Sequence, residues 1–344
     1  MAGIGIGIIG TGSIAITYLR CIEELDETHL VAIYTKSKAR VNAVKDSFKS
    51  DAYSDIDEFL RHPGIDLVCI CNESGNHGEA IVKSAIAGKH VLCEKPIEVT
   101  LPKIDKAIDA CKNHGVKLGV VFQNRCSQDY VALQNAVEQG KLGKLIMGNA
   151  HINWYRSKAY YANNPWRGTH RWDGGAAFIN QGIHTIDLLL NIMGTAASVF
   201  GKVRTSVHEI EGEDVGVGLI TFANGALGAI TAGTALYPGY PERLEIFGEK
   251  GSVLMEGGKI AQWNVQGAPA PEWMSNEKVA SGAADPTNIG HYNHKAVISD
   301  MVMAIQQDRS PMVDGSEGRK SVALITALYR SSKTDKQINI EKLD

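Results

Sequence analysis

The chain has 344 residues, with 35 lysines and arginines against 38 aspartates and glutamates, a formal net charge of −3 and 44% hydrophobic residues. This composition is typical of a globular protein of about two domains and excludes the disordered and fibrous classes. Because the charges nearly balance and no run of five like charges occurs, no positive field is available for a polyanion. Nucleic acid is therefore not an expected partner.

The apolar segments of the chain are short. Runs such as residues 67–71 are far below the roughly 18 residues that a bilayer span requires, so the sequence predicts no membrane-spanning helix. The first basic residue is Arg20, and the positively charged segment that opens a secretory signal is missing. We therefore expect a cytoplasmic protein.

The six cysteines all lie within the first 126 residues. Cys69 and Cys71 stand two residues apart in an apolar run, a spacing that places both on one face of a strand rather than around a metal ion. We expect reduced thiols and no metal site.

The first 125 residues alternate short apolar runs with helical patterns. Strands are expected over residues 3–9, 29–34, 66–71, 90–93 and 117–122, and helices from Ser13, Gly78 and Thr100. This alternation predicts a parallel sheet with helices on both faces. We therefore expect an α/β domain over residues 1–125.

Residues 126–344 show a different pattern. A helix is expected over residues 176–193, followed by strands over 197–207, 215–222, 226–234 and 242–247, with turns at Asn224-Gly225 and Glu249-Lys250-Gly251. All five tryptophans lie in this part, and the Gly, Ala and Pro residues of 267–286 indicate a surface loop. The pattern predicts a second domain of the α+β class with a mostly antiparallel sheet.

A glycine-rich turn gives the first functional signal. The run Gly10-Thr11-Gly12-Ser13-Ile14-Ala15 follows an expected strand and opens an expected helix, which matches the dinucleotide fingerprint in its G-x-G-x-x-A form. Gly10 permits a tight turn, Gly12 lets the backbone approach a pyrophosphate, and the N–H groups at the helix start face the anion. The alternative is a strand-to-helix turn without a ligand.

The end of the second strand bears on the choice of cofactor. NAD-binding chains usually carry an acidic residue there, but this sequence reads Tyr34-Thr35-Lys36-Ser37-Lys38-Ala39-Arg40. Thr35, Lys36 and Arg40 can receive a 2′-phosphate, so we favour NADP over NAD; the alternative is a solvated loop with ordinary surface charge.

Two further segments carry polar residues that call for an explanation. Glu94 and Lys95 end the strand of Gly88-Lys89-His90-Val91-Leu92-Cys93, where ligands of α/β sheets bind. In the helix over 176–193, Asn180, His184, Asp187 and Asn191 share one stripe at 100° per residue. Taken alone, the stripe favours a solvent-facing side or a core histidine bonded to Asp187, and the alternative is a general base that a carboxylate orients.

The segments GIIGTGSIA, AGKHVLCEKP and WRGTHRWDGGAAFINQGIHTIDLL together resemble the glucose-fructose oxidoreductase / inositol dehydrogenase / rhizopine-catabolism (Gfo/Idh/MocA) family. The resemblance spans most of the chain. It implies a Rossmann domain, a second domain with a large open sheet, and hydride transfer between NAD or NADP and a secondary hydroxyl or keto group of a sugar, sugar derivative or cyclitol.

The resemblance also implies roles for individual residues. Lys95 matches the family lysine beside the reacting hydroxyl and His184 the family acid/base, and the two can exchange these parts. Asn180 stands where inositol-type members carry an Asp, which leaves the proton to Lys95 and His184, with Asn180 orienting the substrate. Seven further residues match the cofactor's surroundings or lie in segments that flank it: Cys71, Asn72, His77, Glu94, Gln123, Trp166 and Arg167.

Side chains that suit a carbohydrate follow in the second domain. Aromatic faces stack on sugar C–H surfaces, and arginine binds hydroxyl or carboxylate groups. The candidates are Tyr155, Arg156, Tyr160, Tyr161, Arg167 and Trp172, together with Asn180 and His184. For each aromatic residue, packing beneath a loop is an equally good explanation.

By resemblance we also expect a homodimer or homotetramer, assembled through the open sheet of the second domain. Two other functions stay open at this point. One is a glycosidase that oxidises, eliminates and re-reduces with bound NAD, and the other is a cofactor-binding regulator without catalysis. Retention of both Lys95 and His184 argues against the regulator, since binding alone needs neither.

Overall fold

The computed structural model describes residues 3–274 and 291–343. They form two compact units: one comprises the described residues of Met1–Gln123 and Gly290–Arg319, the other those of Asn124–Ile289 and Lys320–Asp344. The break after Gln123 lies two residues from the expected border at 125. The segment that ends at Arg319, of which residues 291–319 are described, was expected in the second domain, but it packs with the first unit. There, Val120 N donates a hydrogen bond to Val313 O over 2.9 Å.

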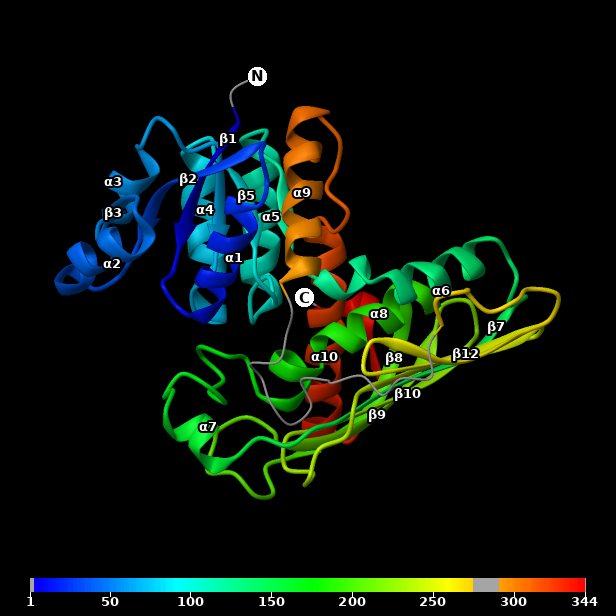
Figure 1. The fold of residues 1–344 in the computed structure, drawn as a ribbon. Coiled ribbons are helices and arrows are strands. Elements are labelled where there is room, and N and C mark those ends of the chain that lie inside the picture. The colour runs from blue at the N-terminus through cyan, green and yellow to red at the C-terminus, as the bar shows by residue number, and fades with distance from the viewer. Residues whose placement is uncertain (1–2, 275–290, 344) are drawn as a thin grey trace. The chain divides into compact units, whose positions relative to one another are not determined.

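The first unit is built on a six-stranded parallel sheet (Figure 1). In spatial order the strands are β3 (Asp51–Tyr53), β2 (Thr28–Tyr34), β1 (Ile4–Ile9), β4 (Leu67–Ile70), β5 (His90–Cys93) and β6 (Leu118–Val120). This is the strand order of a dinucleotide-binding fold, in which the chain reverses direction beside β1. Strands β1, β4, β5 and β6 are mostly buried and apolar because helices cover both faces.

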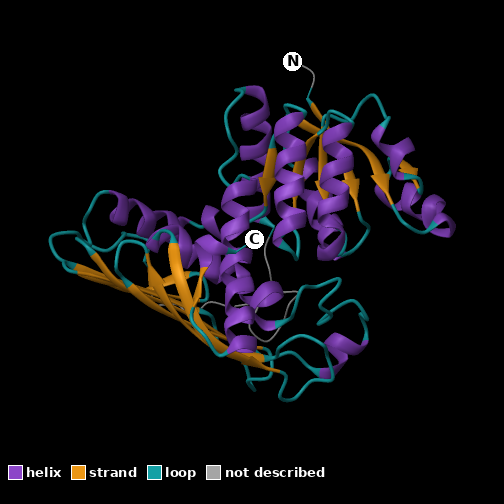
Figure 2. Cartoon of the chain, turned by 180° about the vertical axis from the view of Figure 1, so that it is seen from behind, coloured by secondary structure: helices purple, strands orange, loops and turns teal. Residues whose placement is uncertain are grey.

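Those helices come from both ends of the chain. They are α1 (Ser13–Glu23), α2 (Val41–Phe48), α3 (Ile56–Leu60), α4 (His77–Ile86), α5 (Leu101–Asn113) and α9 (Tyr292–Gln306), with short 3-10 turns η1 (Lys38–Arg40) and η2 (Ser74–Asn76). Helix α1 packs beside α9, and α4 packs beside α5, one pair on each face of the sheet (Figure 2). The predicted α/β class is confirmed.

The second unit is built on an eight-stranded sheet. In spatial order the strands are β13 (Lys259–Val265), β12 (Gly251–Glu256), β11 (Arg243–Gly248), β7 (Leu145–Asn153), β10 (Leu227–Gly233), β9 (Val215–Phe222), β8 (Ala196–Arg204) and β14 (Ile338–Asn339). Only β7 and β10 pair in parallel among these strands, so the sheet is mostly antiparallel, as predicted.

One face of this sheet is covered and the other is open. Burial alternates along β9, where Ile220 is buried and Leu219 is 65% exposed. The helical segments of this unit are η3 (Gln123–Cys126), which starts at the border, α6 (Gln128–Glu138), α7 (Lys158–Ala162), η4 (Ala177–Gly182), α8 (Ile183–Met193), η5 (Ile340–Lys342) and α10 (Gly315–Thr334), which crosses the unit border. Helix α8 packs on β7 and β11, and Ser331 of α10 accepts a hydrogen bond from Gly201 N of β8.

The expected helix over 176–193 is corrected by the structure. Residues Ala177–Gly182 form a π-helix, and the α-helix begins only at Ile183. The wider turn changes the angle between successive side chains, so Asn180 does not belong to a stripe spaced at 100°. Short elements such as α2, β3 and α3 were not predicted because they carry few periodic apolar residues.

Several sequence expectations concern absences. The helices among the described residues include none that is long and apolar enough to cross a membrane. Within those residues no His, Cys, Asp and Glu side chains gather as a metal site would require, and the six cysteines form no disulfide. Of the expected surface loop over 267–286, residues 275–286 lie outside the described part.

Candidate active site

The predicted cofactor residues follow strands whose carboxyl ends lie side by side. The register pairs Ile9 with Tyr34 and with Ile70, Ile70 with Cys93, and Cys93 with Val120. The residues that come next are Gly10, Thr35, Cys71 and Glu94, with Gln123 three residues beyond β6. The structure therefore gathers most of the predicted cofactor residues at one edge of the sheet, the cofactor edge, where parallel sheets bind ligands.

The two glycines of the turn between β1 and α1 have different surroundings. Gly10 has φ +114°, and a Cβ there would lie 2.7 Å from the carbonyl oxygen of Cys71. Gly12 is exposed with φ −78°, and a Cβ there would meet no described atom within 4 Å. Gly10 is thus needed by the fold, whereas Gly12 leaves an open approach to the start of α1, beside Thr11, Ser13 and Ile14.

Two buried acceptor atoms fit a polar ligand at this edge. Asn72 Oδ1 and Gln123 Oε1 are buried without a hydrogen-bond partner within the described part of the chain. Buried polar atoms are normally satisfied, so each of these calls for a donor from outside the protein. Together with the open turn at Gly12, they suit a dinucleotide.

His77 has a structural role that the sequence did not indicate. Its buried ring joins two loops, with Nδ1 2.7 Å from Pro96 O and Nε2 3.1 Å from Asn72 O. Glu98, also buried, accepts hydrogen bonds from Gly78 N at the start of α4 and from Val99 N. These contacts tie the loop after β4 to the loop after β5 and so fix the segment around Lys95.

Glu94 is held from three sides. Its carboxylate accepts a hydrogen bond from Tyr18 Oη over 3.1 Å and from Lys95 N over 3.3 Å, and lies 3.7 Å from His294 Nε2 of α9. Burial lowers the pKa of His294, while Glu94 opposes that shift. Because Glu94 is buried and engaged in this way, its geometry suits positioning of the half-buried Lys95 better than contact with a cofactor.

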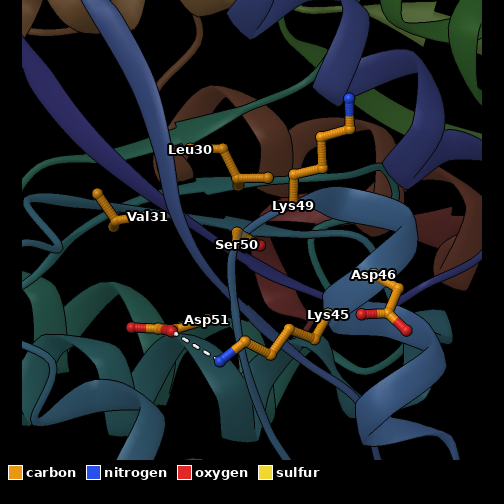
Figure 3. A pocket seen from close by; sticks show the side chains of 7 residues that line it. All are labelled: Leu30, Val31, Lys45, Asp46, Lys49, Ser50 and Asp51. Atoms are coloured by element: carbon orange, nitrogen blue, oxygen red, sulfur yellow. Dashed lines mark hydrogen bonds and ion pairs between the residues drawn. The ribbon is translucent and has the colours of Figure 1, made fainter.

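The candidate 2′-phosphate residues follow β2. Thr35 is buried and its hydroxyl accepts a hydrogen bond from Ser37 N, whereas Lys36 and Arg40 are exposed. A pocket of about 570 Å³ lies nearby, lined by Leu30, Val31, Lys45, Asp46, Lys49, Ser50 and Asp51 (Figure 3). It faces the amino ends of β2 and β3, because Asp51 pairs with Ala32, and so it is separate from the edge that carries Thr35.

In the second unit, a buried carboxylate anchors the start of the π-helix. Glu213 accepts hydrogen bonds from Phe178 N (2.8 Å), Ala176 N (3.3 Å) and Tyr329 Oη (2.8 Å). Burial raises the pKa of Glu213 to about 7, although these donors oppose the shift. The segment that carries Asn180 and leads to His184 is therefore fixed by residues distant in sequence.

Asn180 itself lies within a network of side chains. Its Nδ2 donates to Asp173 Oδ1, and its Oδ1 accepts from Gln181 Nε2 over 2.7 Å. Gln181 Oε1 in turn accepts from Arg156 Nη2 over 2.8 Å. Arg156 was predicted to contact the substrate; its side chain is buried and donates to Gln181.

His184 is half-buried in the first turn of α8, and the carboxylate one turn later is engaged by a cation. Both oxygens of Asp187 accept hydrogen bonds from Arg125, each over 2.7 Å, and both residues are buried. Arg125 was not predicted from the sequence, because an isolated arginine ahead of a helix carries no recognisable pattern.

The predicted aromatic residues divide into core and surface groups. Tyr161 belongs to the core, with its hydroxyl bonded to Thr234 and its ring 4.9 Å from His208. Tyr160 is half-buried, and the Arg167 guanidinium lies 4.0 Å from its ring centroid. Tyr155, Trp166 and Trp172 are also half-buried. The second group keeps surface that a carbohydrate can stack on.

Comparison with known proteins identifies the family to which the chain belongs. Residues 4–122 match the oxidoreductase family with an NAD-binding Rossmann fold, and residues 130–254 match the Gfo/Idh/MocA C-terminal domain. The chain belongs to the Gfo/Idh/MocA family. It is an NAD-binding oxidoreductase by family, and the resemblance inferred from its motifs is confirmed.

Three similar proteins illustrate the range of this family. The WlbA dehydrogenase from Bordetella pertussis, solved with NADH and UDP-GlcNAcA, is 30% identical with a TM-score of 0.88, covering 99% of this chain and 100% of that one. Myo-inositol 2-dehydrogenase of Thermotoga maritima is 27% identical over 98% of this chain and 99% of its own. The scyllo-inositol 2-dehydrogenase (NADP(+)) IolW of Bacillus subtilis is 25% identical over 98% and 96%.

Proposed function

We propose that this protein is an NAD(P)-dependent dehydrogenase that transfers a hydride between the nicotinamide and a secondary hydroxyl or keto group of a sugar, sugar derivative or cyclitol. The observation that carries the proposal is the edge of the parallel sheet to which the open turn at Gly12 and the unsatisfied acceptors of Asn72 and Gln123 all belong. Similarity to inositol dehydrogenases and to a dehydrogenase solved with a UDP-sugar acid supports the substrate class.

A bound nicotinamide would supply the hydride acceptor or donor, and the chain supplies the proton chemistry. A carbinol loses hydride only as its hydroxyl proton leaves, so the reaction needs a base within hydrogen-bond reach and a cation beside the developing alkoxide. We assign these parts to His184 and Lys95, in that order or exchanged, and assign orientation of the substrate to Asn180. Arg156, by contrast, acts through Gln181.

We further propose NADP as the preferred cofactor, because the cations Lys36 and Arg40 follow β2. We also propose a cytoplasmic location, which the six unbridged cysteines support.

A homodimer or homotetramer would cover the open sheet face, where Val217, Leu219 and Leu227 are each more than half exposed. Leu219→Lys would then lower the mass measured by light scattering, without loss of NADPH binding.

The experiment that tests the activity measures absorbance at 340 nm with NAD⁺ or NADP⁺ against a panel of free sugars, inositols, sugar acids, glycosides and UDP-sugars. Aglycone release is followed in parallel. Lys95→Met should lower kcat by about 10²–10⁴, because it removes the cation. Lys112→Met, an exposed lysine of α5, is the matched control and should leave the rate unchanged.

The remaining outcomes separate the alternatives. Aglycone release without an absorbance change would replace the dehydrogenase with a redox glycosidase. Cofactor binding with silence in both channels would contradict the dehydrogenase for every substrate class in the panel and favour a regulator.

A further inference from the structure

Four side chains of the second unit form a hydrogen-bonded chain that runs in one direction. Arg156 Nη2 donates to Gln181 Oε1, Gln181 Nε2 donates to Asn180 Oδ1, and Asn180 Nδ2 donates to Asp173 Oδ1. Asp173 Oδ2 then accepts from Gly168 N over 2.8 Å. Arg156, Gln181 and Asp173 are buried, so these groups meet one another rather than bulk water.

The two charged ends of this hydrogen-bonded chain determine how the Gln181 and Asn180 amides between them are oriented. A guanidinium can only donate hydrogen bonds, and an ionised carboxylate can only accept them. Arg156 therefore draws the amide oxygen of Gln181 toward itself, which turns the Gln181 NH₂ group toward Asn180. Asp173 draws the Asn180 NH₂ group toward itself, which turns the Asn180 oxygen toward Gln181. Both ends demand the same orientation of the Asn180 amide.

The hydroxyl of Tyr160 imposes no orientation on the Gln181 amide. Gln181 Nε2 also donates to Tyr160 Oη over 2.9 Å, but a hydroxyl both donates and accepts, so it adapts to either amide orientation. Tyr160 therefore does not compete with the orientation that the charged ends favour.

We infer that Gln181 and Asp173 are positioning residues that hold the Asn180 amide in one orientation toward the substrate. This inference rests on the proposed dehydrogenase function. It also accounts for an asparagine at position 180: a carboxylate there would face the Asp173 carboxylate at hydrogen-bond distance, and two like charges at that separation repel. The negative charge of this part of the site is on Asp173, and Asn180 is its neutral neighbour.

The test is a pair of substitutions that together reverse the direction of these hydrogen bonds without changing the total charge of the four side chains. In Gln181→Glu, Asn180 has an acceptor on each side, so its oxygen must oppose one of them. In Asp173→Asn, the new amide keeps its oxygen on Gly168 N and opposes its NH₂ to that of Asn180. In the double variant each of the bonds described above is made again: the new carboxylate at position 181 accepts from Arg156, Tyr160 and Asn180, and the new amide at position 173 donates to the Asn180 oxygen.

Melting temperature and kcat are measured for all four proteins, with NADPH affinity as a check that the cofactor edge is intact. Each single variant should lower the melting temperature by roughly 2–6 °C, because one buried pair is mismatched. The double variant should return to the wild-type melting temperature. Its kcat should stay lower by about tenfold or more, with unchanged NADPH affinity, because its Asn180 amide is reversed.

Other results would overturn the inference. If the double variant recovers kcat along with its melting temperature, the direction of the amide does not matter to the reaction. If the double variant melts below either single variant, or if the single variants behave as wild type, the charged ends do not set the direction. A wild-type protein that binds NADPH but oxidises nothing would overturn the proposed function instead, and the melting temperatures would still decide whether the Asn180 amide is held as described.

Discussion

The cofactor edge of the first unit and the Asn180 segment of the second are built by different means. At the edge, strand ends, tight turns and a helix start bring backbone groups together around Gly10 and Gly12. In the segment, buried carboxylates hold a π-helix and its side chains: Glu213 at the start and Asp173 beside Asn180. Backbone devices leave a short local signature in sequence, whereas buried side-chain networks join residues far apart in the chain.

Removal of a buried cation from the second unit should lower the free energy of unfolding more than any change at the cofactor edge. In Arg125→Met, the buried Asp187 carboxylate loses a partner that contacts both of its oxygens. We expect a loss of about 3–5 kcal/mol in the free energy of unfolding, because a buried charge is left unpaired. Urea unfolding measures this loss. The double variant Arg125→Met/Asp187→Leu should recover most of it, and a single variant as stable as wild type would show that water already screens the pair.

The second prediction concerns pH and Glu213. The ordinary pKa of this carboxyl is 4.5 and its folded-state pKa is about 7, so between these values the folded protein holds a proton that the unfolded chain has released. The contribution of Glu213 is therefore fully present below pH 4.5 and is lost as the pH rises through 7. The loss is about 3 kcal/mol in the free energy of unfolding.

Glu213→Gln provides the comparison for that effect, since glutamine does not titrate. The difference in unfolding free energy between wild type and this variant should shift against wild type from pH 5 to pH 8. A difference that stays constant over this range, or that shifts in favour of wild type, would contradict the raised pKa. Glu213 belongs to the second unit and not to the cofactor edge of the first, so the affinity for NADPH should not follow the same pH curve.

The glycine turn provides a matched pair of variants for the first unit. Gly10→Ala places a side chain at φ +114° and 2.7 Å from Cys71 O, so it should cost about 1–3 kcal/mol in the free energy of unfolding. Gly12→Ala meets open space and should leave stability within about 0.5 kcal/mol of wild type. Its effect should fall on the dissociation constant of NADPH, measured by fluorescence, because the methyl group occupies the approach to the helix start.

The pair separates fold from binding at positions two residues apart. If Gly12→Ala binds NADPH as wild type does, the turn is not the phosphate site. If Gly10→Ala is as stable as wild type, the close approach to Cys71 is relieved by a small backbone shift.

Much of the first unit could be predicted because its signals are local. The strand over His90–Cys93 and the helix from Ser13 lie where the pattern put them. The π-helix over Ala177–Gly182 could not be predicted, because its apolar residues also fit an α-helix. Helix α9 returns to the first unit because it packs against α1. Cys21 and His291, which are in contact there, lie 270 residues apart in the sequence, so no short window of sequence contains both.

The candidate site shows the same division. The glycine turn, Lys95 and His184 were found from motifs. The residues that hold them were missed, since a lone carboxylate such as Glu98 or Glu213 has the same appearance in sequence whether it is solvated or buried. Only the fold reveals that each of them accepts backbone N–H groups at the start of a helical segment.

The smallest expected effect concerns the exposed cations after β2. Lys36 and Arg40 are exposed and follow β2, the strand whose carboxyl end lies at the cofactor edge, and a 2′-phosphate bound there would gain charge-assisted contacts. Lys36→Ser/Arg40→Ser should raise KM for NADP⁺ about tenfold and leave KM for NAD⁺ within about twofold, because only NADP⁺ carries that phosphate. Lys45→Ser is the matched control, since this exposed lysine faces the pocket at the opposite strand ends and pairs with Asp51. Equal changes for the two cofactors would mean that the cations act on the pyrophosphate through their general field, and the preference for NADP would then have to be withdrawn.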